Sequence, residues 1–180
     1  MRPPETDRRK IRTRLAITDA MTALMFSRKW RDIRTADLIA RAGVGRSTFY
    51  EHFRSKDEVL LAMIEPLWRP LAEAAVSRAN RFDLQAILAH MWDRRAPARA
   101  LFEPPLAPRL QRKLAQMIEY RLPPTVSGVP AALRATGSAA ATLAVLKAWL
   151  TGEQMCSVEA MAAWLANLEP LSGDGPSSRL

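Results

Sequence analysis

The sequence predicts an all-α protein, and two observations carry this prediction. The alternation of β-branched and polar residues that marks strands is absent, and glycine occurs only seven times in 180 residues. Apolar residues instead recur at spacings of three and four, which puts them on one face of a helix. A chain of this length forms about one or two domains. We expect an N-terminal three-helix domain at residues 1–56 and a C-terminal helical domain at residues 57–180.

Three helices are expected in the N-terminal domain, at residues 7–27, 35–42 and 46–53. The apolar face of the first consists of Ile17, Ala20, Met21, Leu24 and Met25. Gly43 ends the second helix, because glycine enters the left-handed conformation at a helix end most cheaply. A fourth helix begins next to Ser55 and Glu58, which have the spacing of a capping box. Pro66 and Pro70 are expected to kink or break that helix.

The C-terminal part is expected to be helical as well. Its helices are predicted at residues 83–95, 97–103, 107–121, 131–151 and 158–169. Pro123, Pro124 and Pro130 indicate a linker before the long apolar helix at 131–151, and Ser157 is the predicted cap of the last helix. The tail from Ser172 is rich in Ser, Gly and Pro, which predicts disorder.

Composition excludes several classes of protein. No apolar run approaches the roughly 18 residues of a membrane span, and the first residues lack the apolar core of a signal peptide. A single cysteine, Cys156, excludes an internal disulfide framework and a Cys-rich zinc site. We therefore expect a cytoplasmic protein without metal or cofactor. Catalytic triads, phosphate loops and nucleotide fingerprints are also missing, so we expect no enzyme.

The charge of the chain is concentrated near its beginning. The net charge is +9, and residues 1–60 hold 14 basic and 8 acidic side chains. Such a positive field attracts polyanions, which are chiefly nucleic acid or an anionic membrane surface. Charge alone leaves two hypotheses open: a DNA-binding protein, or a basic helical module that binds a membrane or a protein partner. Its concentration next to the two short helices, instead of along one face of a single helix, favours DNA.

Residues 35–56 carry the functional signal. Two short helices joined by a glycine turn form a helix-turn-helix. Its apolar residues are expected to pack inward, namely Leu38, Ala42, Val44, Phe49 and Phe53. Its polar residues are expected to face outward, namely Arg46, Ser47, Thr48, Tyr50 and His52. Arginine reads guanine in a bidentate manner while hydroxyl and imidazole groups bind phosphate, so this outward face suits DNA.

These residues resemble the TetR family of bacterial transcriptional regulators. The resemblance covers about residues 10–62 and rests on Leu38-Ile39, Ala42-Gly43-Val44, Arg46-Ser47-Thr48-Phe49-Tyr50, His52-Phe53, Lys56 and Val59-Leu60. A looser likeness continues through residues 146–161. The resemblance implies an all-helical homodimer that binds double-stranded DNA at a palindromic operator and usually represses. It further implies a C-terminal ligand-binding and dimerisation domain, through which a small-molecule effector releases the DNA.

Carried over to this sequence, the resemblance assigns roles to single residues. Arg34 and Thr35 would approach bases or phosphates, and Arg46 and Ser47 would read bases. The residues that would bind the DNA backbone are Thr48, Tyr50, His52 and Lys56. The sequence departs from the family at Trp30, near a usual glycine, and at Arg34, where a capping hydroxyl is usual. We expect Thr35 to supply the cap one residue later.

Three further assignments have a structural alternative. The basic residues Arg8, Arg9, Lys10, Arg12 and Arg14 form either a solvated helix face or an arm on phosphates or in the minor groove. A second set forms either intramolecular core or, as the resemblance favours, the dimer interface: Leu146, Trp149, Leu150, Met161, Trp164, Leu165 and Leu168. A third set forms either core or the lining of an effector pocket: Trp68, Met91, Trp92, Phe102, Met117 and Tyr120.

Overall fold

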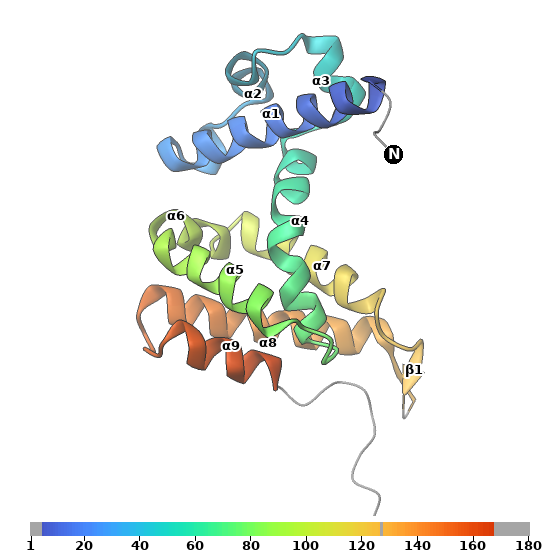
Figure 1. Cartoon of the computed structure of the whole chain (residues 1–180), viewed down its shortest axis with the longest axis vertical. Coiled ribbons are helices and arrows are strands. Elements are labelled where there is room, and N and C mark those ends of the chain that lie inside the picture. Colours follow the sequence, from blue (N-terminus) through green and yellow to red (C-terminus); the bar gives the residue numbers. More distant parts are fainter. Residues whose placement is uncertain (1–4, 127, 168–180) are drawn as a thin grey trace, which may run out of the picture. The chain divides into compact units, whose positions relative to one another are not determined.

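The computed structural model describes residues 5–126 and 128–167 of the chain (Figure 1). The chain divides into two compact units, of which the first ends at Pro66 and the second begins at Leu67. This division falls inside a helix, whereas the boundary expected from the sequence, between residues 56 and 57, falls at the start of that helix. Within residues 5–126 and 128–167, the fold is all-helical apart from one very short hairpin, which confirms the predicted fold class.

The first unit consists of the expected short helices behind a long one. Helix α1 spans Glu5–Ser27, a 3₁₀ turn η1 spans Trp30–Asp32, and helices α2 and α3 span Thr35–Ala42 and Arg46–His52. Helix α1 packs against both α2 and α3. The core contains the predicted face of α1 together with Ile33, Leu38, Phe49, Phe53, Val59, Leu60 and Ile64. Met25 of the predicted face is half-buried.

Helix α4 spans Lys56–Ala74 and joins the two units. The Ser55 hydroxyl accepts the Glu58 backbone N–H at 3.3 Å, which confirms the predicted cap. The Glu58 carboxylate accepts the N–H of Arg54 at 2.7 Å, so the return bond of the box is shifted by one residue. Contrary to one expectation, α4 is not broken at Pro66 or Pro70. The two prolines are four residues apart, so the missing N–H donors fall on one side of the helix.

The second unit contains the remaining helices. Their bounds are Arg81–Asp93 for α5, Arg95–Arg99 for α6, Leu106–Glu119 for α7, Ala131–Thr151 for α8 and Val158–Ala166 for α9. A 3₁₀ turn η2, Ala100–Phe102, follows α6, so the helix predicted at 97–103 is two short pieces. Helix α8 packs against α6 and α7, while α9 packs against α5 (Figure 1). The Ser157 hydroxyl caps α9 through the N–H of Ala160 at 3.1 Å, as predicted.

The segment expected to be a plain linker contains a small antiparallel hairpin. Strands β1, Thr125–Val126, and β2, Val129–Pro130, pair in the register Thr125 with Pro130 and Val126 with Val129. Gly128 lies at φ 78°, a conformation that glycine adopts without steric cost. A two-residue strand has no periodicity that a sequence pattern could reveal.

The core of the second unit holds most of the residues assigned to a dimer interface. Leu146, Trp149, Leu150, Met161 and Leu165 are all buried within the single chain. The Trp149 indole stacks on Trp92 with ring centroids 4.8 Å apart and donates its N–H to the Cys156 carbonyl at 3.0 Å. These five side chains therefore lie in the protomer's own core, which is the structural alternative that the sequence left open for them. Trp164 is 48% exposed, and Leu168 lies outside the described residues, as does the tail from Ser172.

None of the described helices combines the length and the apolar character that crossing a bilayer requires.

Candidate nucleic-acid interface

The turn between α2 and α3 depends on Gly43. This residue lies at φ 64° and ψ 32°, in the left-handed region, and its N–H donates to the carbonyls at the end of α2. The N–H of Val44 donates to the Ile39 carbonyl at 3.3 Å and completes the reversal. Glycine is favoured here because a side chain in this conformation meets its own backbone. The chain then enters α3 two residues after Val44, at Arg46.

Helix α3 has one buried and one exposed face. Phe49 is fully buried, and its ring lies 6.2 Å from that of Phe53, which is 1% exposed. These two rings anchor the helix in the core of the first unit. The residues predicted to face outward are exposed or half-buried: Arg46, Ser47 and Tyr50 are exposed, and Thr48 and His52 are half-buried. The helix therefore presents a polar surface on a rigid apolar base.

Arg46 and Tyr50 lie one helical turn apart and contact each other. The Arg46 guanidinium carbon lies 5.8 Å from the centre of the Tyr50 ring, and the Tyr50 ring meets Phe49 edge-on at 5.4 Å. Cation–π contact restricts the arginine without using its N–H donors. Those donors stay available for a bidentate contact with a base edge.

Arg14 fixes the far end of α3. Its Nη1 donates to the His52 carbonyl at 3.2 Å, and its guanidinium carbon lies 4.4 Å from the centre of the Phe53 ring. Because α3 ends at His52, this bond supplies a donor to one of the carbonyls that a helix C-terminus leaves without a partner. The sequence placed Arg14 in a basic cluster that forms either a solvated helix face or an arm on DNA, and no local pattern reveals its contact across 38 residues with the end of α3.

The other residues of that basic cluster form part of α1. Arg8, Arg9, Lys10 and Arg12 are exposed on the helix that begins at Glu5. An arm that enters a minor groove is an extended segment. The described residues of the cluster instead form an exposed helix face, so none of them lies on an extended arm.

The start of α2 differs from the expected cap. Arg34 is the capping residue and Thr35 is the first residue of the helix, so Thr35 does not supply the cap one residue later. The Asp37 carboxylate accepts the backbone N–H of Arg34 at 2.7 Å and forms an ion pair with Arg28 at 3.0 Å. The Arg34 N–H and, to a lesser extent, Arg28 hold the pKa of Asp37 below its ordinary value of 3.8, against a smaller opposing effect of burial. Arg34 itself is exposed and Thr35 half-buried.

Lys56 is bound to the protein itself. Its Nζ donates to the carbonyl of Ile33 at 2.6 Å and to that of Trp30 at 3.0 Å, and it lies 4.4 Å from the centre of the Trp30 ring. These contacts tie the first residue of α4 to η1. Trp30, where the family usually has glycine, supplies the ring for this contact. A phosphate contact by Lys56 remains a prediction, and it would compete with these two carbonyls for donors.

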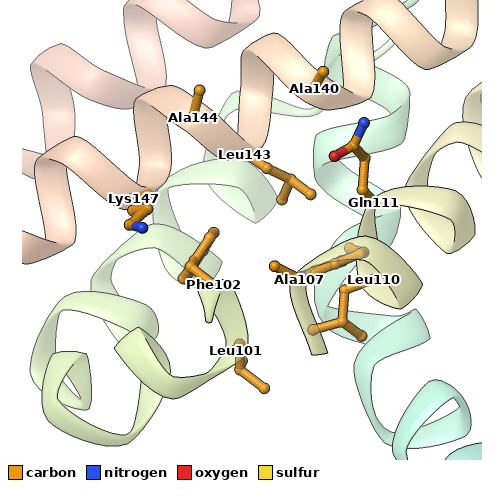
Figure 2. A pocket seen from close by; sticks show the side chains of 10 residues that line it. Leu101, Phe102, Ala107, Leu110, Gln111, Ala140, Leu143, Ala144 and Lys147 are labelled. Atoms are coloured by element: carbon orange, nitrogen blue, oxygen red, sulfur yellow. The ribbon is translucent and has the colours of Figure 1, made fainter. Parts of the chain in front are cut away.

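A cavity of about 190 Å³ lies in the second unit (Figure 2). It is lined by Trp68, Leu101, Phe102, Ala107, Leu110, Gln111, Ala140, Leu143, Ala144 and Lys147. Two residues of the predicted effector pocket, Trp68 and Phe102, therefore line it. The other four lie elsewhere: Met91 and Met117 are buried away from the cavity, Trp92 stacks on Trp149, and Tyr120 is 90% exposed.

Comparison with known proteins agrees with this geometry. A family model described as bacterial regulatory proteins, tetR family, matches residues 17–63, which contain α2, the turn and α3. The chain is 42% identical over 52 residues to the HTH-type transcriptional regulator EthR of Mycolicibacterium smegmatis. It is 32% identical over 84 residues to the uncharacterized HTH-type transcriptional regulator YxbF of Bacillus subtilis. These alignments cover 29% and 45% of this chain but only 24% and 22% of the two relatives, about a quarter of their length.

Solved structures extend the likeness to the whole fold. A TetR transcriptional regulator from Streptococcus agalactiae superposes with a TM-score of 0.55 and 25% identity, covering 89% of this chain and 95% of that one. The dihydroxyacetone kinase operon activator DhaS superposes with a TM-score of 0.53 and 18% identity, covering 86% of this chain and 92% of that one, and so supports the fold alone. Residues 17–63 therefore match the model of the TetR family, and the fold is similar to that of a TetR transcriptional regulator along most of the chain.

Proposed function

We propose that this regulator is a cytoplasmic homodimer that represses transcription from a palindromic operator and is released by a small-molecule effector. The observation that carries the proposal is the α3 surface, where Arg46, Ser47 and Tyr50 are exposed above the buried Phe49. A short helix that is rigid on one side and rich in donors on the other fits a major groove. The likeness to EthR and to the Streptococcus agalactiae regulator supports a role in transcription.

Each exposed residue of the helix-turn-helix has a proposed role. Arg46 and Ser47 read base edges, because they lie in the first turn of α3, where a recognition helix meets the groove. Thr48, Tyr50 and His52 bind phosphates through a hydroxyl or ring N–H group. Arg34 and Thr35, at the start of α2, approach base edges or phosphates.

The proposed dimer uses the outward surfaces of α8 and α9. Leu133 is 65% exposed and Trp164 48% exposed, and the exposed Gly137 and Ala141 follow Leu133 on α8 at four-residue spacing. Small residues on an outward helix face allow close approach of a second helix, and exposed large apolar groups favour burial in an interface. A two-fold dimer would present its two α3 helices to half-sites separated by about one DNA turn, roughly 34–36 Å.

Repression and effector release rest on other grounds. The family resemblance implies repression, whereas DhaS is named as an operon activator, so the sign of regulation needs its own measurement. The cavity beside Trp68 and Phe102 supports effector binding in the second unit. A promoter–reporter assay with the regulator present or deleted distinguishes repression from activation. Higher reporter output in the deletion supports repression, and lower output contradicts it.

The test of DNA recognition starts from the DNA upstream of the regulator's own gene. Fluorescence anisotropy with the purified full chain compares this fragment with a scrambled one at two salt concentrations. We expect tighter binding to the native fragment that persists near ~150 mM salt, because base contacts do not vanish with counterion release. A selection from random duplexes should then return inverted repeats. Equal affinity for all duplexes, lost with salt, would contradict sequence-specific recognition.

A further inference from the structure

The cavity of the second unit has an asymmetric lining that indicates what it binds. One face of α8 supplies Ala140, Leu143, Ala144 and Lys147, which follow one another at helical spacing. Opposite them lie η2 and α7, and Trp68 closes the lining from α4. Most of the lining is apolar, and two residues, Gln111 and Lys147, bring polar groups. Figure 2 shows these two on opposite sides of Leu143, with Gln111 toward Ala140.

The size of the cavity limits the ligand. An apolar cavity of about 150 Å³ accepts a benzene molecule, so about 190 Å³ accommodates one six-membered ring with small substituents. Trp68 and Phe102 supply aromatic walls, against which a flat ring packs edge-on or offset. The stretch of α8 from Ala140 to Lys147 rises about 10 Å, which is close to the length of a ring that carries a polar group at each end.

The positive charge at one end of the cavity favours a negatively charged ligand. Lys147 lines the cavity, whereas its ion-pair partner Glu103, at 3.0 Å, does not. Lys147 is thus the one lining residue with a charged side chain, and its ammonium has three donors. Both members of the pair are substantially exposed, 43% and 58%, and such an exposed ion pair contributes little net stability. A carboxylate held by the apolar walls can therefore replace Glu103 as the partner of Lys147.

The group at the other end is an amide. The Gln111 side chain makes no hydrogen bond with another residue in the part of the chain that the structure describes, and it is half-buried. An amide both donates and accepts, so it suits a hydroxyl or a similar small polar substituent. Its place away from Lys147 puts that substituent at the opposite end of the ring from the carboxylate.

We propose that this cavity binds a monocyclic aromatic carboxylate, with the carboxylate on Lys147, the ring between Trp68 and Phe102, and a polar substituent on Gln111. The proposal deepens the effector part of the proposed function and rests on it only for the consequence on DNA. Binding would detach Glu103 from Lys147. Glu103 directly follows η2, and its carbonyl accepts the N–H groups of Leu106 and Ala107 at the start of α7. The ligand would thus loosen a tie between α8 and the segment that leads into α7.

The test is isothermal titration calorimetry of the full chain with four probes: benzoate, 4-hydroxybenzoate and the two corresponding neutral amides. We expect both acids to bind and the amides to bind at least tenfold more weakly. Lys147→Met keeps most of the apolar stem but removes the charge, and should weaken 4-hydroxybenzoate about tenfold or more without changing the amides. Arg112→Met, an exposed change on α7 outside the cavity, removes the same charge and should leave all four unchanged.

Two further variants test the ends of the ligand separately. Glu103→Gln removes the competing carboxylate, so both acids should bind several-fold more tightly. Gln111→Leu should weaken 4-hydroxybenzoate and spare benzoate. The proposal is overturned if neither acid binds the wild type into the millimolar range, if the amides bind equally well, or if Lys147→Met has no effect.

The same samples distinguish this proposal from the proposed regulation. DNA affinity is measured with and without 4-hydroxybenzoate. If 4-hydroxybenzoate binds in a way that depends on Lys147 but leaves the DNA affinity unchanged, the result supports the carboxylate site and contradicts effector release. Retained DNA binding in a chain that binds no acid contradicts the site and leaves the DNA-binding proposal intact.

Discussion

Arg46 is the residue on which sequence discrimination should depend. It is exposed in the first turn of α3, and its contact with the Tyr50 ring orients it without engaging its donors. Arg46→Ala should therefore cost about 1–3 kcal/mol of binding to the selected operator and relax the preference at one base position. Competition anisotropy against operators changed at single positions measures both effects.

Arg41→Ala is the matched control for Arg46→Ala. Arg41 is an exposed arginine in the last turn of α2, so its removal changes the net charge equally. It should lower affinity for all duplexes alike and leave discrimination unchanged. Unchanged discrimination in Arg46→Ala as well would remove Arg46 from base reading.

Lys56 should matter first for stability. Its ammonium holds the carbonyls of Trp30 and Ile33 and lies on the Trp30 ring. Lys56→Ala should lower the free energy of unfolding by about 1–3 kcal/mol, because charged hydrogen bonds to backbone carbonyls are lost. Urea unfolding measures this change. Combined with Trp30→Leu, the loss should be less than additive, because the two residues share one contact.

A different result would identify Lys56 as a residue that contacts DNA. If Lys56→Ala unfolds like the wild type but binds all duplexes more weakly with a smaller salt dependence, then Lys56 acts as a phosphate contact. Lys10→Ala, an exposed change on α1, supplies the reference for the loss of one surface charge.

At the scale of helices, the starts were predictable where the capping group is a hydroxyl. Ser55 and Ser157 stand directly before their helices, and each hydroxyl accepts the backbone N–H three residues later. The start of α2 at Thr35 was predicted, but its capping group was not: the Asp37 carboxylate accepts the N–H of Arg34, and no hydroxyl is involved. An acidic residue three positions after the capping residue was the signal that could have revealed this cap.

The cap of α2 should give the first unit a pH dependence. The pKa of Asp37 is lowered in the folded state, mainly by the bond from the Arg34 N–H. The contribution of the carboxylate to stability is therefore fully present above its ordinary pKa of 3.8, and is lost as the pH falls through the lower folded value. Asp37→Asn should unfold at lower urea concentration than the wild type at neutral pH, and this difference should shrink in acid. A difference that is constant with pH would contradict the role of the charge.

The turn before α3 should tolerate few residues. Gly43 lies at φ 64°, and a methyl group on its Cα would meet no neighbouring atom within 4 Å, so a substitution carries a conformational cost without a steric clash. Gly43→Ala should lower the free energy of unfolding by about 1–2 kcal/mol. Gly43→Asn adds a larger side chain but should cost less, because asparagine enters the left-handed region more readily. Equal losses for the two variants, measured by urea unfolding, would contradict a conformational origin.

For the whole molecule, the helical class and the helix-turn-helix could be predicted, because spacing and turn residues are local signals. Local signals do not show which apolar residues pack against another helix of the same chain. Leu146, Trp149 and Leu150 resemble an exposed apolar stripe along the sequence, yet α6, α7 and the residues around them cover that stripe. The cavity was predictable only in part, since Trp68 and Phe102 meet Lys147 through the packing of α4, η2 and α8.

The dimer is the prediction that belongs to this scale. Trp164→Glu and Leu133→Glu place charges on the proposed outward surface of α9 and α8, and each should shift the chain from dimer to monomer in sedimentation velocity. Phe82→Glu is the matched control, since Phe82 is 81% exposed on α5, outside that surface. Dissociation by all three variants, or by none, would contradict the proposed interface.

Cys156 makes the chain ready for distance spectroscopy without prior mutagenesis. It is the single cysteine of the sequence, its side chain is exposed, and its own carbonyl is held by Trp149 between α8 and α9. A nitroxide attached there occupies one defined place per protomer. Two identical copies then give one spin–spin separation, and its change on adding operator DNA or an aromatic acid reports how the pair rearranges. Exposed thiols can oxidise to intermolecular disulfides, so size measurements require a reductant.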